Sequence, residues 1–488
     1  MKTTKQLFLL LTLLLLLCSS FQFKYKVFRE KPLEGYFLLA DKPDLKYFTW
    51  RRWLAGDFQS EMQKRVEDHI GFRNDLCRVR NQVDFSLFNI VNARGFIAGK
   101  NGYLYEEDYI HEYTGKYFIG TKTLDKKMIR LKNVYDSLKA RNIELIVVFE
   151  PGKASILPEY IPSRFKSQQR TLSNYEYILK KAGELGLPYL DLNRYFLQLK
   201  DKVDYPLFHK YGMHWSLYGV SFAMDTLVKY IEKRCQTNLQ EIRINGMEFS
   251  DTARASDNDI GEMLNVIFPL APTLAAYPKV SIEEDPARRN LKVLTIADSY
   301  YLTLVSDMSR TVFKENVYWY YNNRLYPYHN QVPAQWIDKT KLVEQYSGFN
   351  VILLMISEIN LHYGFWNFAD EAYLAFHPEV RDDYIYKIEN NIRNERSWFQ
   401  FMVKKARQQN CSLEEMIRRD AQYLSHADYN NQKDKTASDS INEIIYIMES
   451  NQEWLSTVSD KAKKENIPLD SMKLSEARYL YRKSLQKN

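Results

Sequence analysis

A serine and a histidine each stand where an apolar segment gives way to an expected helix. Ser299 follows a buried strand expected over 292–296 and precedes residues with helical spacing. Such a turn exposes the hydroxyl and directs free backbone N–H groups toward a developing oxyanion. His214 lies in a loop just before the helix expected after Ser216, where a neutral imidazole can accept a hydroxyl proton. The two residues predict a nucleophile and its general base, and helix capping by Ser299 is the alternative.

Several stretches resemble the alginate O-acetyltransferase family of the AlgJ and AlgX type. They are an Asp-His-x-x-x-Arg segment at 67–73, a Gly-Lys-Asn-Gly-x-Leu hairpin within 97–105, Pro151-Gly152-Lys153, His214-Trp215-Ser216 and Asp298-Ser299. The resemblance extends from about Phe58 to Leu361, and as in the family the histidine precedes the serine. It implies a periplasmic SGNH-like protein that O-acetylates an envelope or secreted polysaccharide through Ser299 and His214. It also implies a membrane-bound O-acyltransferase partner that supplies the acyl group.

One departure from the family pattern concerns the acid that orients the histidine. The family has an aspartate two residues before the histidine, and this chain has Gly212 there. A triad without its acid loses several orders of magnitude in rate, because the imidazole tautomer and the imidazolium are no longer stabilised. Asp204, Asp298 and Glu358 are candidates for the third member, and a backbone carbonyl could orient His214 in place of an acid. A site that has kept binding and lost chemistry is the alternative.

Other residues are expected to bind substrate. Lys153 and Glu358 follow strand candidates, and Trp215 adjoins the histidine. The segment 317–336 is rich in aromatic residues interleaved with amides and an arginine, a composition that suits sugar faces and hydroxyls. Its candidate binding residues are Trp319, Tyr321 and Arg324. An edge strand that packs on the core is an equally good interpretation of this segment.

The middle of the chain predicts an SGNH-like α/β domain over 121–368. Short apolar runs at 145–149, 189–192, 293–296 and 351–355 alternate with helical patterns, as in a parallel sheet covered by helices on both faces. Sites in such sheets form at the carboxyl ends of the strands. The segment 24–120, which contains the Asp-His-x-x-x-Arg motif, is expected to be an amino-terminal extension.

The first 23 residues predict a signal anchor. Lys2 and Lys5 precede an apolar run from Leu7 to Cys18, and Lys24 and Lys26 follow it. The positive charge before the run places the amino terminus in the cytoplasm and the body in the periplasm, attached to the inner membrane. Cleavage of the segment and release into the periplasm is the alternative.

The region 369–488 contains a duplication and predicts an all-helical domain. Residues from Trp398 to Leu424 recur from Trp454 to Leu480 with an offset of 56. Each copy has the pattern of two helices with an apolar face that one pair cannot bury alone. We therefore expect the two pairs to pack against each other, with Trp398 and Trp454 in equivalent buried positions.

Composition excludes some functions. The net charge of +7 over 488 residues is small and its cations are scattered, so nucleic acid is not an expected partner. Cys77, Cys235 and Cys411 form no metal-ligand spacing, and we expect neither metal nor cofactor. Two further functions remain open beside acyl transfer. They are a non-catalytic glycan-binding or assembly protein on the same fold, and a carbohydrate esterase.

Overall fold

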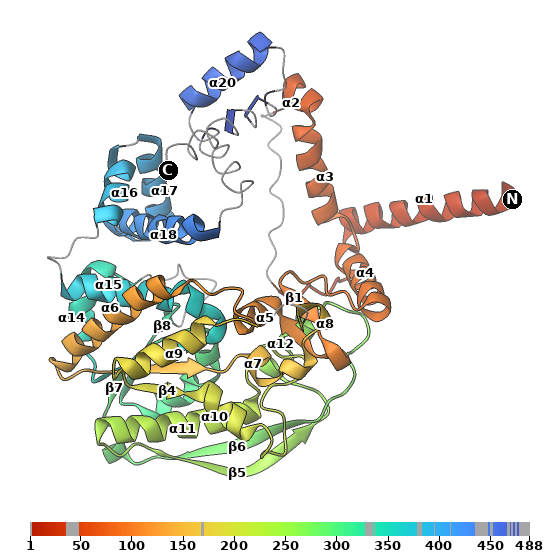
Figure 1. Ribbon diagram of the computed structural model, residues 1–488. Helices are drawn as coiled ribbons and strands as arrows, with labels where there is room; N and C mark the ends of the chain where they lie inside the picture. The colour runs from red at the N-terminus through yellow and green to blue at the C-terminus, as the bar shows by residue number, and fades with distance from the viewer. Residues whose placement is uncertain are drawn as a thin grey trace. The chain divides into compact units, whose positions relative to one another are not determined.

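The chain folds into two compact units, Met1–His377 and Pro378–Asn488. The computed structural model in Figure 1 describes residues 2–35, 48–166, 170–326, 335, 337–377, 383–394, 396–409, 411–434, 448, 452–465 and, singly, 469, 472, 473, 476 and 477. The division falls later than the boundary expected after residue 368. Helix α15 (Phe368–Phe376) belongs to the first unit because Asp370 is paired with Lys127 at 2.7 Å and Arg130 at 2.6 Å.

A six-stranded sheet forms the centre of the first unit, with strand order β4-β3-β10-β7-β8-β9. Its strands are β3 (Glu144–Glu150), β4 (Tyr189–Asp191), β7 (Lys292–Ala297), β8 (Glu315–Tyr320), β9 (Arg324–Tyr326) and β10 (Val351–Ser357). The first five in spatial order are parallel, and the edge strand β9 is antiparallel to β8. The SGNH-like α/β prediction is confirmed, with the correction that the sheet is mixed.

Successive side chains of a strand point to opposite faces of the sheet, and both sets are apolar here, so helices cover both faces. In β3, Leu145 and Val147 join one buried cluster and Ile146 and Val148 the other. The first cluster is closed by α6 (Thr121–Lys139), α9 (Asn174–Glu184), α14 (Leu342–Tyr346) and α15. The second is closed by α10 (Leu192–Leu199) and α11 (Leu217–Cys235), on the other side of the sheet in Figure 1. All seven residues of β10 are buried, as expected for a central strand.

Smaller elements surround the carboxyl edge of the sheet. They are the hairpin β1 (Phe96–Ala98) and β2 (Leu104–Glu106), then α5 (Glu107–Tyr113), α7 (Lys153–Ile156), α8 (Ser163–Lys166), α12 (Asp259–Met263) and α13 (Val305–Asp307). A two-stranded antiparallel arm, β5 (Glu241–Ser250) and β6 (Ala275–Glu283), frames the segment that contains α12. Both α12 and the loop before α11 reach the end of β7, which positions the site.

Four helices precede the hairpin. They are α1 (Lys2–Tyr25), α2 (Trp50–Ala55), α3 (Asp57–His69) and α4 (Arg73–Phe88). The apolar run predicted as an anchor lies in α1. Within the part of the chain that the structure describes, no helix is both long and apolar enough to cross a membrane. The Asp-His-x-x-x-Arg motif forms the corner between α3 and α4, where Arg73 donates to Asp68 at 3.1 Å and Phe72 takes a φ of 62°.

The second unit contains α16 (Asp383–Asn394), α17 (Arg396–Gln408), α18 (Leu413–Asp434) and α20 (Gln452–Glu465). The 56-residue duplication has matching contacts. Lys405 pairs with Asp420 at 2.5 Å, and Lys461 with Glu476 at 2.9 Å. Buried Ala406 and Met416 likewise correspond to buried Ala462 and Met472.

The expected packing of one helix pair on the other is not what the described residues show. Helix α16 covers the stripe of α17 and α18 through Ile385, Ile388 and Ile392. The same apolar spacing recurs in the sequence at Ile441, Ile444 and Met448, so the sequence repeat extends back to these positions. Each copy therefore has an apolar cluster of its own. Trp398 packs half-buried against the first cluster, and the side chain of Trp454 lies outside the described ones.

Candidate active site

Ser299 occupies the predicted turn between a strand and a helix. Strand β7 ends at Ala297, and a 3₁₀ helix begins at Ser299 and ends at Thr303. Asp298 caps this helix, because its Oδ1 accepts from the N–H of Tyr300 at 3.1 Å. The other carboxylate oxygen accepts from Ser357 Oγ at 2.6 Å and from the Asn360 amide at 2.8 Å. Asp298 thus joins the turn to the end of β10 and leaves the Ser299 hydroxyl half-buried at the sheet edge.

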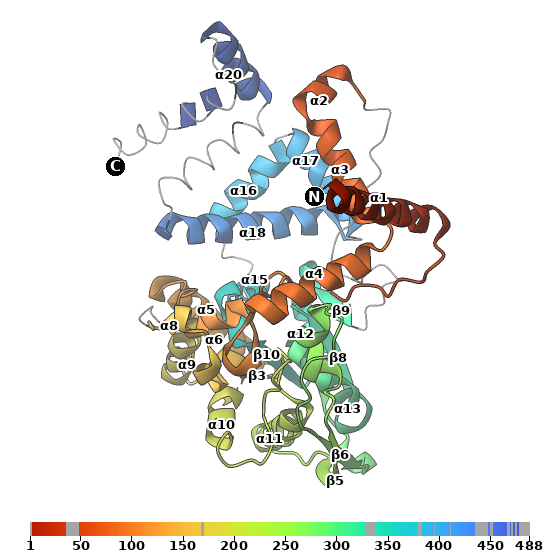
Figure 2. The same ribbon diagram turned by 90° about the vertical axis from the view of Figure 1, so that its right-hand side faces the viewer.

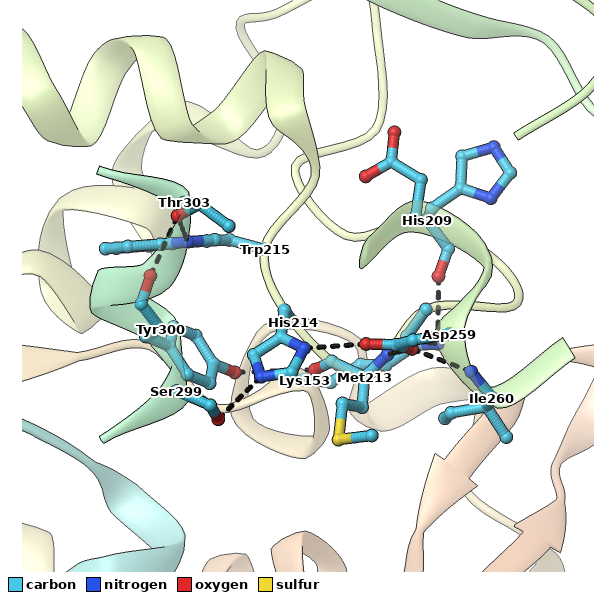
Figure 3. A network of polar contacts seen from close by, with 12 residues as sticks. Lys153, His209, Met213, His214, Trp215, Asp259, Ile260, Ser299, Tyr300 and Thr303 are labelled. Atoms are coloured by element: carbon cyan, nitrogen blue, oxygen red, sulfur yellow. Dashed lines mark hydrogen bonds and ion pairs between the residues drawn. The ribbon is translucent and has the colours of Figure 1, made fainter. Parts of the chain in front are cut away.

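His214 lies directly opposite Ser299. Its Nε2 is 2.8 Å from Ser299 Oγ (Figure 3), so the predicted contact between the two side chains is present. The loop that carries His214 ends at Ser216, whose Oγ accepts from the N–H of Gly219 at 3.0 Å and caps α11. A short bridge between Phe208 and Trp215 closes the loop at its base. The capped helix α11 and the Phe208–Trp215 bridge therefore fix the loop that carries the imidazole.

The acid beside His214 is Asp259, which the sequence did not single out. Its Oδ2 is 2.6 Å from His214 Nδ1, and its Oδ1 accepts from the N–H groups of Met213 at 2.8 Å and Ile260 at 2.7 Å. Two backbone donors fix the carboxylate, which places the imidazole proton on Nδ1 and leaves Nε2 as the acceptor for the serine proton. Ser299, His214 and Asp259 thus have the connectivity of a catalytic triad.

None of the three acids considered from the sequence orients His214. Asp298 caps the helix of Ser299, and the Glu358 carboxylate accepts from Asn193 and Ser155. Asp204 has no contact with His214 in the structure, which gives both imidazole nitrogens other partners. No pattern pointed to Asp259, because it stands 45 residues from His214 and begins a five-residue helix in a polar stretch.

Gly212 explains why the acid comes from α12. A Cβ at this position would lie 2.5 Å from the carbonyl oxygen of Ser256 and 3.1 Å from that of Asp257. The same segment is bonded to the histidine loop, since Gly261 donates its N–H to the carbonyl of Tyr211 at 3.1 Å. The backbone that carries Asp259 therefore fills the space where the family's aspartate would stand. The two positions are alternatives for one function.

Lys153 is buried under the histidine loop, which does not fit the expected role in substrate binding. Its Nζ lies 2.7–3.1 Å from four backbone carbonyl oxygens, those of Leu104, His209, Lys210 and Gly212. Burial lowers the pKa of this ammonium group to about 7, an effect that the Asp259 carboxylate opposes. The contacts join strand β2 to the loop that positions His214. Lys153 is a positioning residue.

Trp215 is likewise fully buried and does not face a ligand. Its indole N–H donates to Thr303 Oγ1 at 2.9 Å, and that hydroxyl donates to the carbonyl of Tyr300 at 2.8 Å. The ring also packs edge-on against Tyr300, with centroids 5.1 Å apart. Trp215 thereby connects the loop of His214 to the helix of Ser299 (Figure 3). This connection fixes the position of the His214 side chain relative to that of Ser299.

Glu358 is also a buried residue that connects elements of the fold. It is 2% exposed, accepts a hydrogen bond from the Asn193 amide, and accepts another from Ser155 Oγ at 2.5 Å. A Cβ on Gly152 would lie 3.0 Å from its Oε2, so the carboxyl group also fills the space beside this glycine. Glu358 connects the ends of β10, α7 and α10 beneath the site. It is not available to a substrate.

Four carboxyl groups, of which Glu112, Asp257 and Glu358 are buried and Glu106 is half-buried, should make the fold less stable as the pH rises. Burial raises the pKa of Glu106, Glu112 and Asp257 to about 7, and that of Glu358 to about 8. Between about pH 4 and pH 8 the native protein then holds protons that the unfolded chain has released, so the free energy of unfolding falls with rising pH. We expect the Tm from thermal unfolding to be lower at about pH 8.5 than at about pH 5.5.

The variant Glu358→Gln tests this assignment. Glutamine cannot release a proton, so the difference between the two Tm values should shrink. Glu262→Gln, a change at an exposed carboxylate, should leave the difference unchanged. An unaltered difference in the Glu358 variant would show that this carboxyl group does not titrate with folding.

Among the described residues of the aromatic segment, Tyr321 lies at the site. Trp319 lies on β8, is 2% exposed and packs on Tyr346, so it belongs to the core. Tyr321 follows β8, and its backbone N–H donates to the carbonyl of Ala297 at 2.8 Å. Burial raises the pKa of its phenol, and a hydrogen-bonding contact with Ser299 acts in the opposite direction. Tyr321 is thus beside the serine.

Arg324 begins β9 and stands opposite Tyr320 in the pairing of the two edge strands. It is half-buried at the rim of the sheet, near the turn that carries Tyr321. The rest of the predicted carbohydrate segment, residues 327–334 and 336, lies outside the described residues.

Comparison with known families gives a match over the same region. The SGNH hydrolase-like domain of the acetyltransferase AlgX matches residues 96–295, which include Lys153, His214 and Asp259 and end just before Ser299. A curated relative, the alginate biosynthesis protein AlgX of Pseudomonas putida, is 26% identical over 109 residues, which are 21% of this chain and 23% of that protein. The chain spans about a quarter of the length of this relative. The resemblance inferred from the motifs is confirmed.

Two solved structures are similar in fold. The O-acetyltransferase domain of Pseudomonas putida AlgJ has 17% identity and a TM-score of 0.37, with 55% of this chain and 92% of that chain covered. Pseudomonas aeruginosa AlgX has 11% identity and a TM-score of 0.37, with 57% and 67% covered. At such identities and scores the likeness by itself assigns no role to any residue.

Proposed function

We propose that this chain is an O-acetyltransferase acting on a polysaccharide, since its residues 96–295 match the SGNH hydrolase-like domain of the acetyltransferase AlgX. The observation that carries the proposal is the complete Ser299–His214–Asp259 arrangement at the carboxyl edge of the sheet. A binding protein descended from such an enzyme has no need to retain all three contacts. The acid supplied from α12 removes the main reason for expecting lost chemistry.

The first half of the reaction acetylates Ser299. His214 Nε2 takes the proton from Ser299 Oγ as this oxygen attacks the carbonyl carbon of an acetyl donor. The tetrahedral intermediate collapses, the bond to the leaving group breaks, and the leaving group receives the proton from the imidazolium. Asp259 stabilises the imidazolium between the two transfers and is not itself protonated. An acetyl ester on Ser299 results.

The second half transfers the acetyl group to the acceptor. A sugar hydroxyl gives its proton to His214 Nε2 and attacks the ester carbonyl, and Ser299 Oγ leaves and takes the proton back. Tyr321 and Arg324 are the proposed substrate-binding residues, because they border the Ser299 side of the site. A ring face and a guanidinium suit a sugar plane and its hydroxyl or carboxylate groups.

We also propose the setting of this reaction. The acyl group comes from a membrane-bound O-acyltransferase partner, and the protein works in the periplasm, held at the inner membrane by α1. The exposed leucines of α1, among them Leu7, Leu10 and Leu14, support attachment to lipid. The alginate named for the relative AlgX is one member of the substrate class, and its place here is part of the proposal.

An acceptor-dependence assay separates the proposed transferase from an esterase and from a binding protein. The full chain is incubated with 4-nitrophenyl acetate alone and with a panel of bacterial polysaccharides. We expect one polysaccharide to accelerate nitrophenolate release and to carry new acetyl esters afterwards. Release of free acetate that no polysaccharide redirects would identify an esterase. The absence of nitrophenolate release together with retained polysaccharide binding would identify a non-catalytic protein.

A further inference from the structure

Helix α4 turns its polar side inward and its apolar side outward. The buried guanidinium of Arg78 donates to the carbonyl oxygens of residues 31 and 32 at 2.9 and 2.6 Å. Asn81 donates to the carbonyl of Leu264 at 2.9 Å, and Gln82 accepts from two backbone N–H groups at 267–268. The inner face of α4 is thus fastened to the segment after α12, beside it in Figure 2, by polar contacts.

The outer face of α4 carries apolar residues at helical spacing, continued by one residue just beyond its end. These residues, called the α4 stripe here, are between 46% and 71% exposed, and they are Leu76, Val79, Val83, Leu87, Phe88 and Ile90. Soluble helices place such a stripe against the core and their charges outside. The reversal indicates that something apolar covers the α4 stripe.

The position of α1 indicates what covers it. The corner just before α4 packs on the end of α1, since a Cβ on Gly71 would lie 2.2 Å from the carbonyl oxygen of Ser19 and 2.6 Å from the N–H nitrogen of Phe23. The side-chain amide of Gln22 holds the chain that follows α1. Its Nε2 donates to the carbonyl oxygen of Phe28 at 2.6 Å, and its Oε1 accepts from the N–H of Phe28 at 3.0 Å. The α4 stripe therefore begins where the leucine-rich helix ends.

Cations surround this junction. Lys24 in the last turn of α1, and Lys26 and Arg29 in the segment just after it, are all exposed. Exposed Arg80 stands beside Val79 of the α4 stripe, with its guanidinium 3.5 Å from the Asp84 carboxylate. Apolar side chains interspersed with cations are the composition of helices that lie in the interface of an anionic bilayer.

We propose that the α4 stripe lies on an anionic lipid bilayer, with its apolar side chains at the boundary between head groups and acyl chains. The leucines of α1 bring the chain to the membrane, and α4 then rests on the surface. The proposal rests on the attachment of α1 to lipid and is independent of the chemistry at Ser299. Failure of one therefore does not imply failure of the other.

Photo-crosslinking tests the occupant of the stripe directly. The full chain with p-benzoylphenylalanine in place of Val83 is reconstituted with vesicles of phosphatidylethanolamine and phosphatidylglycerol, and is also irradiated in intact cells. A second chain carries the same group at exposed Lys229 on α11 as the control. We expect a phospholipid adduct at position 83 in both settings, and none at position 229. Each altered chain should keep its Tm, because both side chains face outward.

Four other outcomes would overturn the proposal. An adduct with another protein in cells would make the α4 stripe a protein-docking surface. An adduct with a second copy or another segment of this chain would make it an internal contact. Absence of any adduct at position 83 would show that the stripe faces water. Equal lipid adducts at positions 83 and 229 would also contradict it, because binding would then not be specific to α4.

Discussion

Replacing Asp259 by asparagine is expected to lower the rate of acetyl transfer about ten-thousandfold. The reason lies in the two backbone N–H groups, of Met213 and Ile260, that point at Oδ1. An asparagine places its carbonyl oxygen there, so its NH₂ group faces His214 Nδ1. The imidazole must then accept at Nδ1 and carry its proton on Nε2, where it cannot receive the proton of Ser299. Turnover of 4-nitrophenyl acetate measures the effect.

Two further variants sharpen this test. Glu262→Gln removes an exposed carboxylate from the same helix and should leave the rate unchanged. The double variant Gly212→Asp with Asp259→Ala restores an acid at the family's position, but Ser256 occupies the space of the new Cβ. We therefore expect no rescue. Wild-type turnover by Asp259→Asn would show that another group orients His214, and full rescue by the double variant would show that the loop at 212 is free to move.

The sequence predicted the elements that present Ser299 and His214, because their signals are local. Continuous apolar runs followed by a helical pattern define the end of β7, and Ser216 marks the start of α11. Parallel strands bring such ends to one edge of the sheet, which is where the sequence placed Ser299. His214 lies in the loop before α11, and its predicted contact with Ser299 is present in the structure. The same reasoning could not find Asp259, whose position depends on a close contact between two backbones at Gly212.

Residue type alone misplaced several candidates for substrate binding. Lys153 and Glu358 follow strands of the sheet and Trp215 adjoins His214 in sequence, but each is buried and bonded to backbone or side-chain groups that hold the site together. Burial is a property of the packed fold, and a single sequence does not show which polar side chain finds its partners inside. The α4 stripe shows the same limit for apolar residues. Its helical spacing can be recognised in the sequence, but the sequence does not show that this face points away from the core.

Replacing Ser299 by alanine is expected to abolish transfer, with a loss of about a millionfold in kcat, because no other group forms the acetyl ester. The Tm should change little, since the hydroxyl is half-buried and its removal leaves no cavity in the core. Ser306→Ala, an exposed serine in the segment that follows, is the matched control and should keep full activity. Wild-type turnover by Ser299→Ala would reduce Ser299 to a helix-starting residue.

Peptide mass spectrometry of the acetylated intermediate tests the triad most directly. The full chain is mixed with 4-nitrophenyl acetate in the absence of an acceptor, quenched in acid within the first turnovers and digested. We predict one added acetyl group on the peptide that contains Ser299, its absence in Ser299→Ala, and its loss when an acceptor polysaccharide is added before the quench. An acetyl group on a different residue, or turnover with Ser299 unmodified at every time point, would contradict the proposed mechanism.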